Sequence, residues 1–361
     1  MKKSLVALVV LASCGAAMAQ SSVTLYGILD VGFEKLPGVS ARVSNNQESN
    51  GRIGFKGVED LGGGLQASFV VETGIMGDKG GFSSNSGLAS IGNRASWLSV
   101  GSNSLGKFSL GRGYVGAFFT QLWADPTGNS YGQAGGGTLL IYSNVNNTRF
   151  DNAIRYETPN LYGFSADLGL GLHGDAGETR PAVDAGGAAG SATRNISAAN
   201  RTGYTLHTQY NQGPIYVGLS AARMPARTGA GGALSDNGKR VYTLGASYDL
   251  GVVKVYGAFE IDDRYNNDNK AGHIGVSAPL GAGTLMAWYG VDQNGGVTLG
   301  DKYKVGMVAY SYALSKRTDV YGAYTNDGVN GTPAVVGARK VAVSAGLADG
   351  NSLQVGIRHK F

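Results

Sequence analysis

Residues 351–361, which end the chain, read NSLQVGIRHKF. In an extended strand, successive side chains point to opposite faces. One face of this stretch carries Leu353, Val355, Ile357, His359 and Phe361, and the other carries Ser352, Gln354, Gly356, Arg358 and Lys360. Chain ends are normally frayed and polar unless a sheet or helix ties them down. An alternation that runs to the final phenylalanine therefore predicts a last strand that is held in a sheet.

The same period of two recurs along the chain, for example in VTLYGILDVGFE (residues 23–34), GLQASFVVETG (64–74) and YGFSADLGLGL (162–172). Seven short turns alternate with eight longer loops, and together they would join 16 strands. The long loops are expected at 35–50, 74–91, 113–149, 173–200, 223–238, 262–270, 292–301 and 326–349. The loop 173–200, rich in Gly, Ala and Ser, is expected to be mobile and not a domain linker.

Composition narrows the class of protein. The 361 residues include 60 Gly and 19 Tyr but only 8 Pro, and this content of Tyr and apolar residues argues against a disordered chain. After the N-terminus no apolar run approaches the ~18–20 residues that a membrane-spanning helix needs. Many short strands with glycine-rich turns fit these numbers better than long helices do.

These patterns predict an all-β fold, a transmembrane antiparallel β-barrel of 16 strands. In lipid every backbone N–H and C=O must be paired within the protein, so a spanning sheet has to close on itself. Closure requires the last strand to pair with the first, Val23–Glu34, with Phe361 at the periplasmic interface. Aromatic residues near strand ends would form interfacial girdles; they are Tyr26, Phe33, Tyr162, Phe164, Tyr210, Tyr248, Tyr312 and Tyr324.

The N-terminus predicts a signal peptide, residues 1–19, before a barrel domain at 20–361. Lys2 and Lys3 precede an apolar stretch, and Ala17-Met18-Ala19 forms an A-x-A cleavage site. A lipoprotein signal ending at Cys14 is the alternative. Cleavage after Ala19 would remove the single cysteine and leave 28 basic residues (30 − 2) against 25 acidic ones, a net charge of +3. This small excess does not argue for nucleic-acid binding.

Four blocks carry a resemblance to a known family: QSSVTLYGILDVGFE (20–34), GRIGFKGVEDLGGGLQASFVVETG (51–74), GNRASWLSVGSNSLGKFSLGR (92–112) and NAIRYETPNLYGFSA (152–166). With the ending VGIRHKF, they resemble the general-diffusion porins of Gram-negative outer membranes, in the β-proteobacterial branch. The resemblance implies a 16-stranded homotrimeric barrel for passive diffusion of small hydrophilic solutes. It also implies a long third loop folded into the lumen, and a terminal Phe361 read by the outer-membrane assembly machinery.

A pore selects by its diameter and by the charge of its lining. Alternation turns Arg52, Lys56, Arg94 and Arg155 inward. The resemblance implies that Arg52, Arg94 and Arg155 form a basic ladder at the constriction, where a permanently charged guanidinium can pass an anion along. The alternative is that each arginine pairs with a carboxylate, such as Glu72, and only shapes the wall.

The third long loop, 113–149, has apolar residues that suit packing against the inner wall. Phe118 to Trp123 could form a short helix that stops before Pro126. Asp125 is the only carboxylate of the loop, and we expect it to face the arginines. One loop carboxylate against several arginines predicts a preference for anions.

Other functions have weaker support. Two G-x-G-x-x-G matches, at 111–116 and 169–174, lack the βαβ setting of a dinucleotide site, and the four histidines have no metal-ligand spacing. We expect no cofactor, no metal site and no enzymatic activity. A substrate-selective porin for sugar, phosphate or dicarboxylate is the main alternative, followed by an outer-membrane barrel enzyme or an adhesin. Expected partners besides a homotrimer and small anions are outer-membrane lipids and lipopolysaccharide, the latter through rim residues such as Arg264 and Lys270.

Overall fold

The computed structural model describes residues 22–36, 40–83, 90–114, 116–131, 149–172, 179–181, 193–195, 203–223, 240–263, 269–293, 302–329 and 350–361. The predicted signal peptide, residues 1–19, lies outside these ranges, as do Arg264 and parts of the predicted long loops. Within the described residues, the helical content offers no segment that is both long and apolar enough to cross a bilayer.

Strands make up nearly all of the described chain. The first group is β1 (Ser22–Lys35), β2 (Arg42–Asn45), β3 (Arg52–Gly62), β4 (Leu65–Gly74), β5 (Ala95–Ser102), β6 (Gly106–Tyr114), β7 (Arg149–Glu157) and β8 (Phe164–Gly171). The second group is β11 (Gly203–Gln212), β12 (Ile215–Arg223), β13 (Arg240–Asp249), β14 (Lys254–Asp262), β15 (Asn269–Leu280), β16 (Gly283–Asp292), β17 (Tyr303–Ala313), β18 (Thr318–Val329) and β19 (Gly350–Lys360). Each strand of these groups pairs antiparallel with its neighbours in one sheet, and a separate small sheet pairs β9 (Thr179–Pro181) with β10 (Thr193–Asn195).

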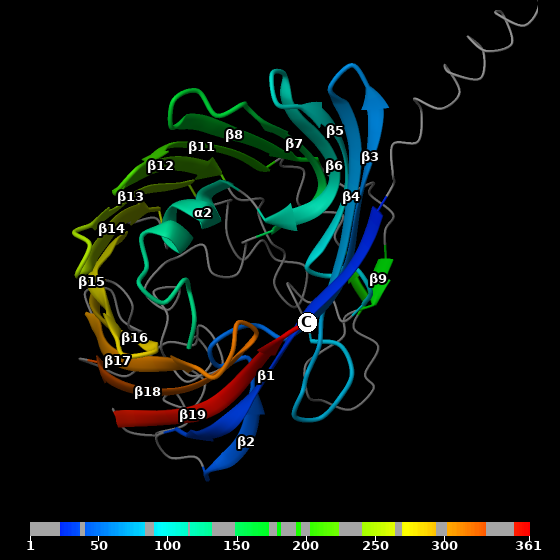
Figure 1. The fold of residues 1–361 in the computed structure, drawn as a ribbon. Helices are drawn as coiled ribbons and strands as arrows, with labels where there is room; N and C mark the ends of the chain where they lie inside the picture. Colours follow the sequence, from blue (N-terminus) through cyan, green and yellow to red (C-terminus); the bar gives the residue numbers. More distant parts are fainter. Residues whose placement is uncertain are drawn as a thin grey trace, which may run out of the picture.

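The large sheet closes into a ring, because its last strand pairs with its first (Figure 1). Strand β19 runs antiparallel to β1 over eight residue pairs, from Ile28 opposite Lys360 to Lys35 opposite Leu353. The terminal Phe361 extends the ladder by two backbone hydrogen bonds with Gly27, at 3.0 and 3.1 Å. The closure predicted from residues 351–361 is therefore confirmed, and the barrel has no open edge.

The closed sheet contains 17 strands, of which β2 and β3 together make one crossing. Both pair with β1, β3 along its first half (Ser22 to Ile28) and β2 along its second half (Val31 to Glu34). The segment 46–51 interrupts the crossing between them. The predicted number of 16 crossings is thus confirmed, with one crossing divided into two strands.

The two faces of the barrel follow the predicted alternation. On β1 the apolar Leu25 and Phe33 are exposed on the outside, whereas Asp30 and Glu34 are buried inside. An apolar exterior over a polar interior is the arrangement that a membrane-spanning barrel requires. Tyr26 corrects one prediction: it does not belong to an outer girdle, because its hydroxyl donates to Glu72 inside the barrel. The alternation of β1 itself, with Leu25 outside, requires this inward direction.

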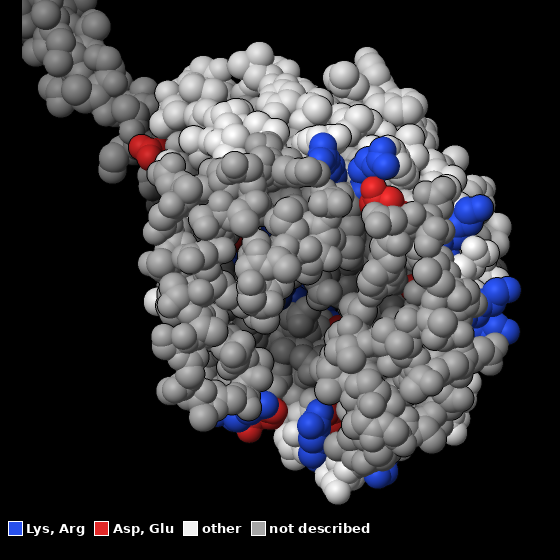
Figure 2. All heavy atoms as spheres, turned by 180° about the vertical axis from the view of Figure 1, so that it is seen from behind, with Lys and Arg blue, Asp and Glu red and all other residues white. Residues whose placement is uncertain are grey.

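The predicted loop helix is confirmed as α2 (Gly116–Trp123), which ends before Pro126. It packs against β8, β11, β12 and β13, and in Figure 1 it lies within the ring of strands. The same ring seen from behind is hollow at its centre (Figure 2). Of the predicted third loop, residue 115 and residues 132–148 lie outside the described ranges, so the course of the whole loop stays a prediction.

Candidate functional site

The first charged group on the inner wall is built around Arg94. Arg94 lies directly before β5, and its side chain is almost fully enclosed, with 1% of the residue exposed. Its Nε donates to Glu72 Oε1 at 2.7 Å and its Nη2 donates to the hydroxyl of Tyr114 at 3.0 Å. The other oxygen of Glu72 accepts a hydrogen bond from the Tyr26 hydroxyl at 3.0 Å. A buried ion pair is tolerated only when its remaining polar atoms are bonded in this way.

Two further arginines join this group. The Arg149 guanidinium lies 3.9 Å from the centre of the Tyr114 ring, and its Nε donates to the carbonyl oxygen of Arg94 at 2.8 Å. Arg52, at the start of β3, donates to the carbonyl oxygen of Asn50 at 2.9 Å. It also lies close enough to Arg94 to interact with it electrostatically.

We call this group the Tyr114 cluster; it consists of Tyr26, Arg52, Glu72, Arg94, Tyr114 and Arg149. Within it, the formal charges of three arginines and one carboxylate add up to +2 (3 − 1 = 2). Arg52 and Arg149 are only half-buried, so part of this charge borders the interior space. Charges on a low-dielectric wall attract counter-ions more strongly than charges in open water do. The structure therefore brings together two of the predicted ladder arginines, Arg52 and Arg94, around a tyrosine that the sequence analysis had not singled out.

Arg155 on β7 lies outside the Tyr114 cluster and pairs with two carboxylates of its own. Its Nε donates to Asp167 Oδ2 at 2.7 Å, and its Nη2 lies 3.1 Å from Glu157 Oε1. The Glu157 carboxylate in turn contacts Lys107 Nζ at 2.7 Å. Its guanidinium also lies 5.2 Å from the ring centre of Phe119 on α2. Arg155 therefore connects the wall to the loop helix, with two carboxylates offsetting its charge.

Lys56 lies further along β3. Its side chain is exposed, and its Nζ lies 5.3 Å from the centre of the Tyr26 ring. Because Tyr26 also bonds to Glu72, Lys56 borders the Tyr114 cluster. A cation over a tyrosine ring at this distance is a weak attraction that leaves the ammonium free to meet ions.

Asp125 holds the turn that follows α2. Its Oδ1 accepts hydrogen bonds from the backbone N–H and the hydroxyl of Thr127, both at 2.9 Å, and its Oδ2 accepts one from Asn129 N–H at 2.9 Å. The carboxylate is buried and lies near His273 on β15. The structure thus places it on the side of the barrel made by β14 and β15. The prediction that Asp125 faces the arginines across the lumen stays a prediction.

A row of inward side chains on β11 to β15 holds α2 in place, and we call it the loop seat. His207 Nδ1 lies 2.8 Å from Thr120 Oγ1, and His273 Nε2 lies 2.7 Å from the carbonyl oxygen of Ala124. Glu260 Oε2 accepts bonds from Gln121 Nε2 at 2.7 Å and from Thr243 Oγ1 at 3.0 Å.

Glycine makes room for this contact. A Cβ at Gly245 on β13 would lie 2.6 Å from the carbonyl oxygen of Thr120 and 2.8 Å from Ala124 Cβ. A Cβ at Gly275 on β15 would lie 2.7 Å from the ring of Pro126. The sequence therefore leaves space on the wall where the loop approaches it.

A second charged group, the Arg358 cluster, lies where β1, β18 and β19 meet the segment 46–51. Arg358 Nη2 lies 2.9 Å from Asp319 and 3.2 Å from Glu48, and its Nη1 donates to the Ser49 hydroxyl at 2.7 Å. Glu48 lies outside the strands. Its burial, together with a hydrogen bond to Asp319, raises the pKa of the Glu48 carboxyl to about 8.

The third loop reaches this second cluster. Tyr131 is fully buried, its ring centre lies 5.7 Å from that of Tyr321 on β18, and its N–H donates to the carbonyl oxygen of Gln47. The Tyr321 hydroxyl in turn donates to Asp30 Oδ1 at 2.5 Å. Residues 116–131 are thus attached to the wall at both of their ends.

The sequence analysis missed Tyr114, Arg149, Glu48 and Arg358 as site residues. For Arg358 the sequence does hold a signal, because in residues 351–361 it shares the polar, inward face with Ser352 and Gln354. For metal binding, the described part of the chain gathers no group of three or more His, Cys, Asp or Glu side chains that could hold an ion.

Comparisons with known proteins agree with this geometry. A family model described as Gram-negative porin matches residues 4–332. Outer membrane porin protein 32 of Delftia acidovorans is 35% identical over the full length of both chains. An outer membrane porin protein of Bordetella pertussis is 31% identical, also over the full length of both chains.

Solved structures give the same result. An anion-selective porin from Comamonas acidovorans superposes with a TM-score of 0.70 at 26% identity, covering 95% of this chain and all of that one. OmpF of Salmonella typhi, at 14% identity and a TM-score of 0.65 over 94% of this chain and 97% of its own, shares the fold. The closed barrel and charged inner wall of the present chain agree with these matches. Together they show that the chain belongs to the Gram-negative porins of the outer membrane.

Proposed function

We propose that this porin is a water-filled channel for passive diffusion of small hydrophilic solutes and ions, and that it prefers anions. The observation that carries the preference is the Tyr114 cluster, where three arginines meet one carboxylate on the inner wall. A preformed positive field raises the local concentration of anions and lowers that of cations. The similarity to a porin described as anion-selective supports the proposal.

The third loop would set the width of the channel. Residues 116–131 take up space beside the inner wall, bonded to His207, Glu260 and His273 on one side and to Gln47 on the other. In this proposal solutes pass between the loop and the arginine-bearing wall, and Asp125 contributes mainly by holding the turn after α2. Arg155, whose charge is offset by two carboxylates, would contribute less to ion preference than Arg52 and Arg149.

The remaining expectations complete the proposal. Residues 1–19 would be removed as a signal peptide, and the mature chain would assemble as a homotrimer in contact with outer-membrane lipids. Phe361 would be the residue that the assembly machinery reads. We propose no catalytic role, since His207 and His273 are engaged in holding the loop.

A liposome swelling series would test the channel. Purified protein is placed in liposomes, and swelling rates are measured for neutral sugars of rising size and for anionic and cationic solutes of matched size. A general channel predicts rates that fall smoothly with size and are higher for the anionic member of each pair. A sharp optimum for one sugar would instead support the substrate-selective alternative, and no swelling would contradict a channel.

A further inference from the structure

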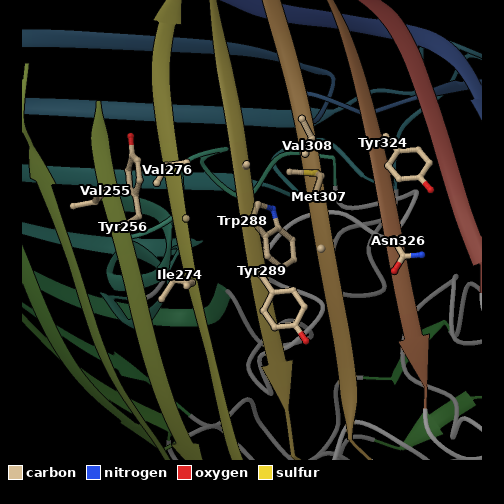
Figure 3. A pocket seen from close by; sticks show the side chains of 13 residues that line it. Val255, Tyr256, Ile274, Val276, Trp288, Tyr289, Met307, Val308, Tyr324 and Asn326 are labelled. Atoms are coloured by element: carbon tan, nitrogen blue, oxygen red, sulfur yellow. The ribbon is translucent and has the colours of Figure 1, made fainter. Parts of the chain in front are cut away.

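Two hollows in the barrel wall differ in their lining. One, of about 680 Å³, lies between mostly apolar side chains of the five neighbouring strands β14 to β18 (Figure 3). The other, of about 460 Å³, lies between β2 and the segment 76–83 that follows β4. We call it the β2 pocket; most of its lining is polar and includes Arg42, Ser44, Asn45, Asn50, Asp78 and Lys79. Because polar groups that converge in a pocket select and orient its ligand, a hydrophilic molecule suits this second hollow.

The β2 pocket exists because the crossing after β1 is interrupted. The segment 46–51 separates β2 from β3, and the chain after β4 continues alongside it, with the N–H of Ile75 donating to the carbonyl oxygen of Gly51 at 3.0 Å. Ile75 also pairs with Phe82, so that residues 75–82 form a small hairpin. Among the described residues β2 pairs with β1 and not with this hairpin, which leaves the β2 pocket between the two.

The β2 pocket lies at the outer end of the barrel. The hairpin belongs to the predicted long loop 74–91, whereas the tight turn at Gly63 and Gly64, between β3 and β4, lies at the opposite end. Outer-membrane barrels keep short turns in the periplasm and long loops at the cell surface. Arg42 lies opposite Glu34, which is buried on the inner face, so the β2 pocket borders the outer entrance of the channel.

The acceptor side of the β2 pocket consists of Asn45 and Asp78. Asn45 Nδ2 donates to Asp78 Oδ1, which fixes the orientation of the amide. The other atom of this amide, Asn45 Oδ1, is buried and has no hydrogen-bond partner among the described residues. Buried polar atoms are rarely left without a partner in folded proteins. An amide oxygen next to a carboxylate suits an ammonium group, which donates several hydrogen bonds and carries a positive charge.

Two cationic side chains line the same β2 pocket. Lys79 follows Asp78 in the hairpin, and its side chain is exposed. Arg42 Nε donates to Glu34 Oε1 at 2.7 Å, while 55% of the Arg42 side chain stays exposed. Guanidinium and ammonium groups are the side-chain donors that bind carboxylates most strongly. The β2 pocket therefore offers binding points of both signs within one small volume.

We propose that the β2 pocket binds zwitterions of the α-amino acid type, with the ammonium on Asp78 and Asn45 and the carboxylate on Lys79 and Arg42. A neutral sugar would leave the charges of Asp78 and Lys79 without a partner, and an inorganic anion would leave Asp78 and Asn45 unused. The site goes beyond the channel function and its ion preference, because it depends on the geometry between β2 and the hairpin. Single-channel conductance, measured on the same samples, separates a failure of this site from a failure of the channel.

The test uses refolded full-length barrel in non-ionic detergent, with L-glutamine as the probe and a ligand-detected NMR titration to measure its Kd. Asp78→Asn removes the negative charge but keeps an acceptor for Asn45, and Lys79→Gln removes a positive charge. Asp60→Asn and Lys316→Gln, exposed residues at short turns of the other end, are the matched controls. Three further probes are titrated into the unchanged protein: N-acetyl-L-glutamine lacks the ammonium, L-glutaminamide lacks the carboxylate, and glucose lacks both.

We expect saturable binding of one L-glutamine per barrel. Asp78→Asn should weaken binding roughly tenfold, because a charge-assisted hydrogen bond is lost, and Lys79→Gln about threefold, because Lys79 is exposed. Both controls should bind like the unchanged protein, and the three further probes should bind more weakly than L-glutamine. An absence of saturable binding, or an unchanged Kd in Asp78→Asn, would overturn the proposal. Glucose or N-acetyl-L-glutamine binding as tightly as L-glutamine would also overturn it, and this arm does not depend on the folding of any variant.

Discussion

The two halves of the inner wall use polar residues for different purposes. On β3 to β7, arginines gather around Tyr114 and next to Phe119, and part of their charge borders open space. On β11 to β15, the inward His207, Glu260 and His273 are taken up by hydrogen bonds to the loop helix and the turn after it. An inward polar residue is therefore no measure of pore charge until its partners are known.

The same comparison applies among the arginines. Arg94 is the most deeply buried of the predicted ladder and is paired with Glu72, which makes it a residue that holds the wall together. Arg52 and Arg149 are half-buried and belong to a group with only one carboxylate. The ion pair of Arg94 fits the second of the two interpretations raised by the sequence, a structural role, and the basic ladder stays a prediction for Arg52.

The largest expected effect is on stability, from Arg94→Ala. The substitution leaves the Glu72 carboxylate with its main charged partner removed, and breaking a buried pair costs about 3–5 kcal/mol. Urea unfolding in lipid vesicles, followed by tryptophan fluorescence, measures the free energy of unfolding. Lys107→Ala is the matched control, because its pair with Glu157 is far more exposed and should contribute under about 1 kcal/mol.

The rescue variant sharpens this test. Arg94→Ala combined with Glu72→Gln should lose less stability than Arg94→Ala alone, since no unpaired charge remains buried. Equal losses for Arg94→Ala and Lys107→Ala would mean that burial does not distinguish the two pairs.

The second largest effect is expected from Glu260→Ala, which weakens the attachment of α2 to the loop seat. Removing the carboxylate leaves Gln121 and Thr243 without their shared acceptor, which costs about 1–3 kcal/mol. We expect a larger or noisier single-channel conductance, because α2 is less firmly held, with little change in ion preference. A conductance trace identical to that of the unchanged protein would show that other contacts suffice to hold the loop.

Two glycine substitutions, Gly245→Ala and Gly257→Ala, test the packing of the loop against the loop seat without changing any charge. Gly245→Ala places a methyl group 2.6 Å from the Thr120 carbonyl oxygen, whereas at Gly257 the nearest atom lies 3.5 Å from an added Cβ. Gly245→Ala should therefore reproduce the noisy conductance, and Gly257→Ala should not.

The smallest expected effect is a pH dependence that arises at Glu48. Its pKa is raised to about 8 by burial, so the neutral form predominates below that pH and the carboxylate forms above it. Because the folded-state pKa is the higher one, Glu48 contributes stability below its ordinary pKa, and this contribution is lost as the pH rises through about 8. Anion preference should fall slightly between about pH 7 and 9, as a negative charge appears beside Arg358. Reversal potentials of the unchanged protein and of Glu48→Gln, which should lack this pH step, provide the check.

Much of the fold could be predicted from the sequence, because a period of two fixes which face each side chain takes. The outward Leu353 and Val355, the inward Gln354 and the closure of β19 on β1 all follow from that rule. For Tyr26 the prediction of a girdle position is wrong, because the alternation of β1 turns its side chain inward to Glu72 although it lies near a strand end.

The rest of the site depends on irregularities that the alternation does not contain. The register of β6 with β7 shifts between Gly111 and Gly113, and Asn152 on β7 takes a positive φ of 49°. Beyond such a bulge the alternation no longer says which way a side chain points, so Arg149 could not be placed from Arg155. The break at 46–51, which puts Glu48 beside Arg358, is likewise a tertiary feature without a repeating signal.

The central claim is that the Tyr114 cluster gives this channel its preference for anions. The direct measurement is the reversal potential of single channels in a planar bilayer under a KCl gradient. It compares the unchanged protein with Arg52→Gln/Arg149→Gln, which keeps the Arg94–Glu72 pair, and with the control Arg317→Gln on an exposed short turn. We predict anion preference in the unchanged protein and the control, and its loss or near loss in the double variant. A preference for cations, or a double variant with an unchanged reversal potential, would contradict the account.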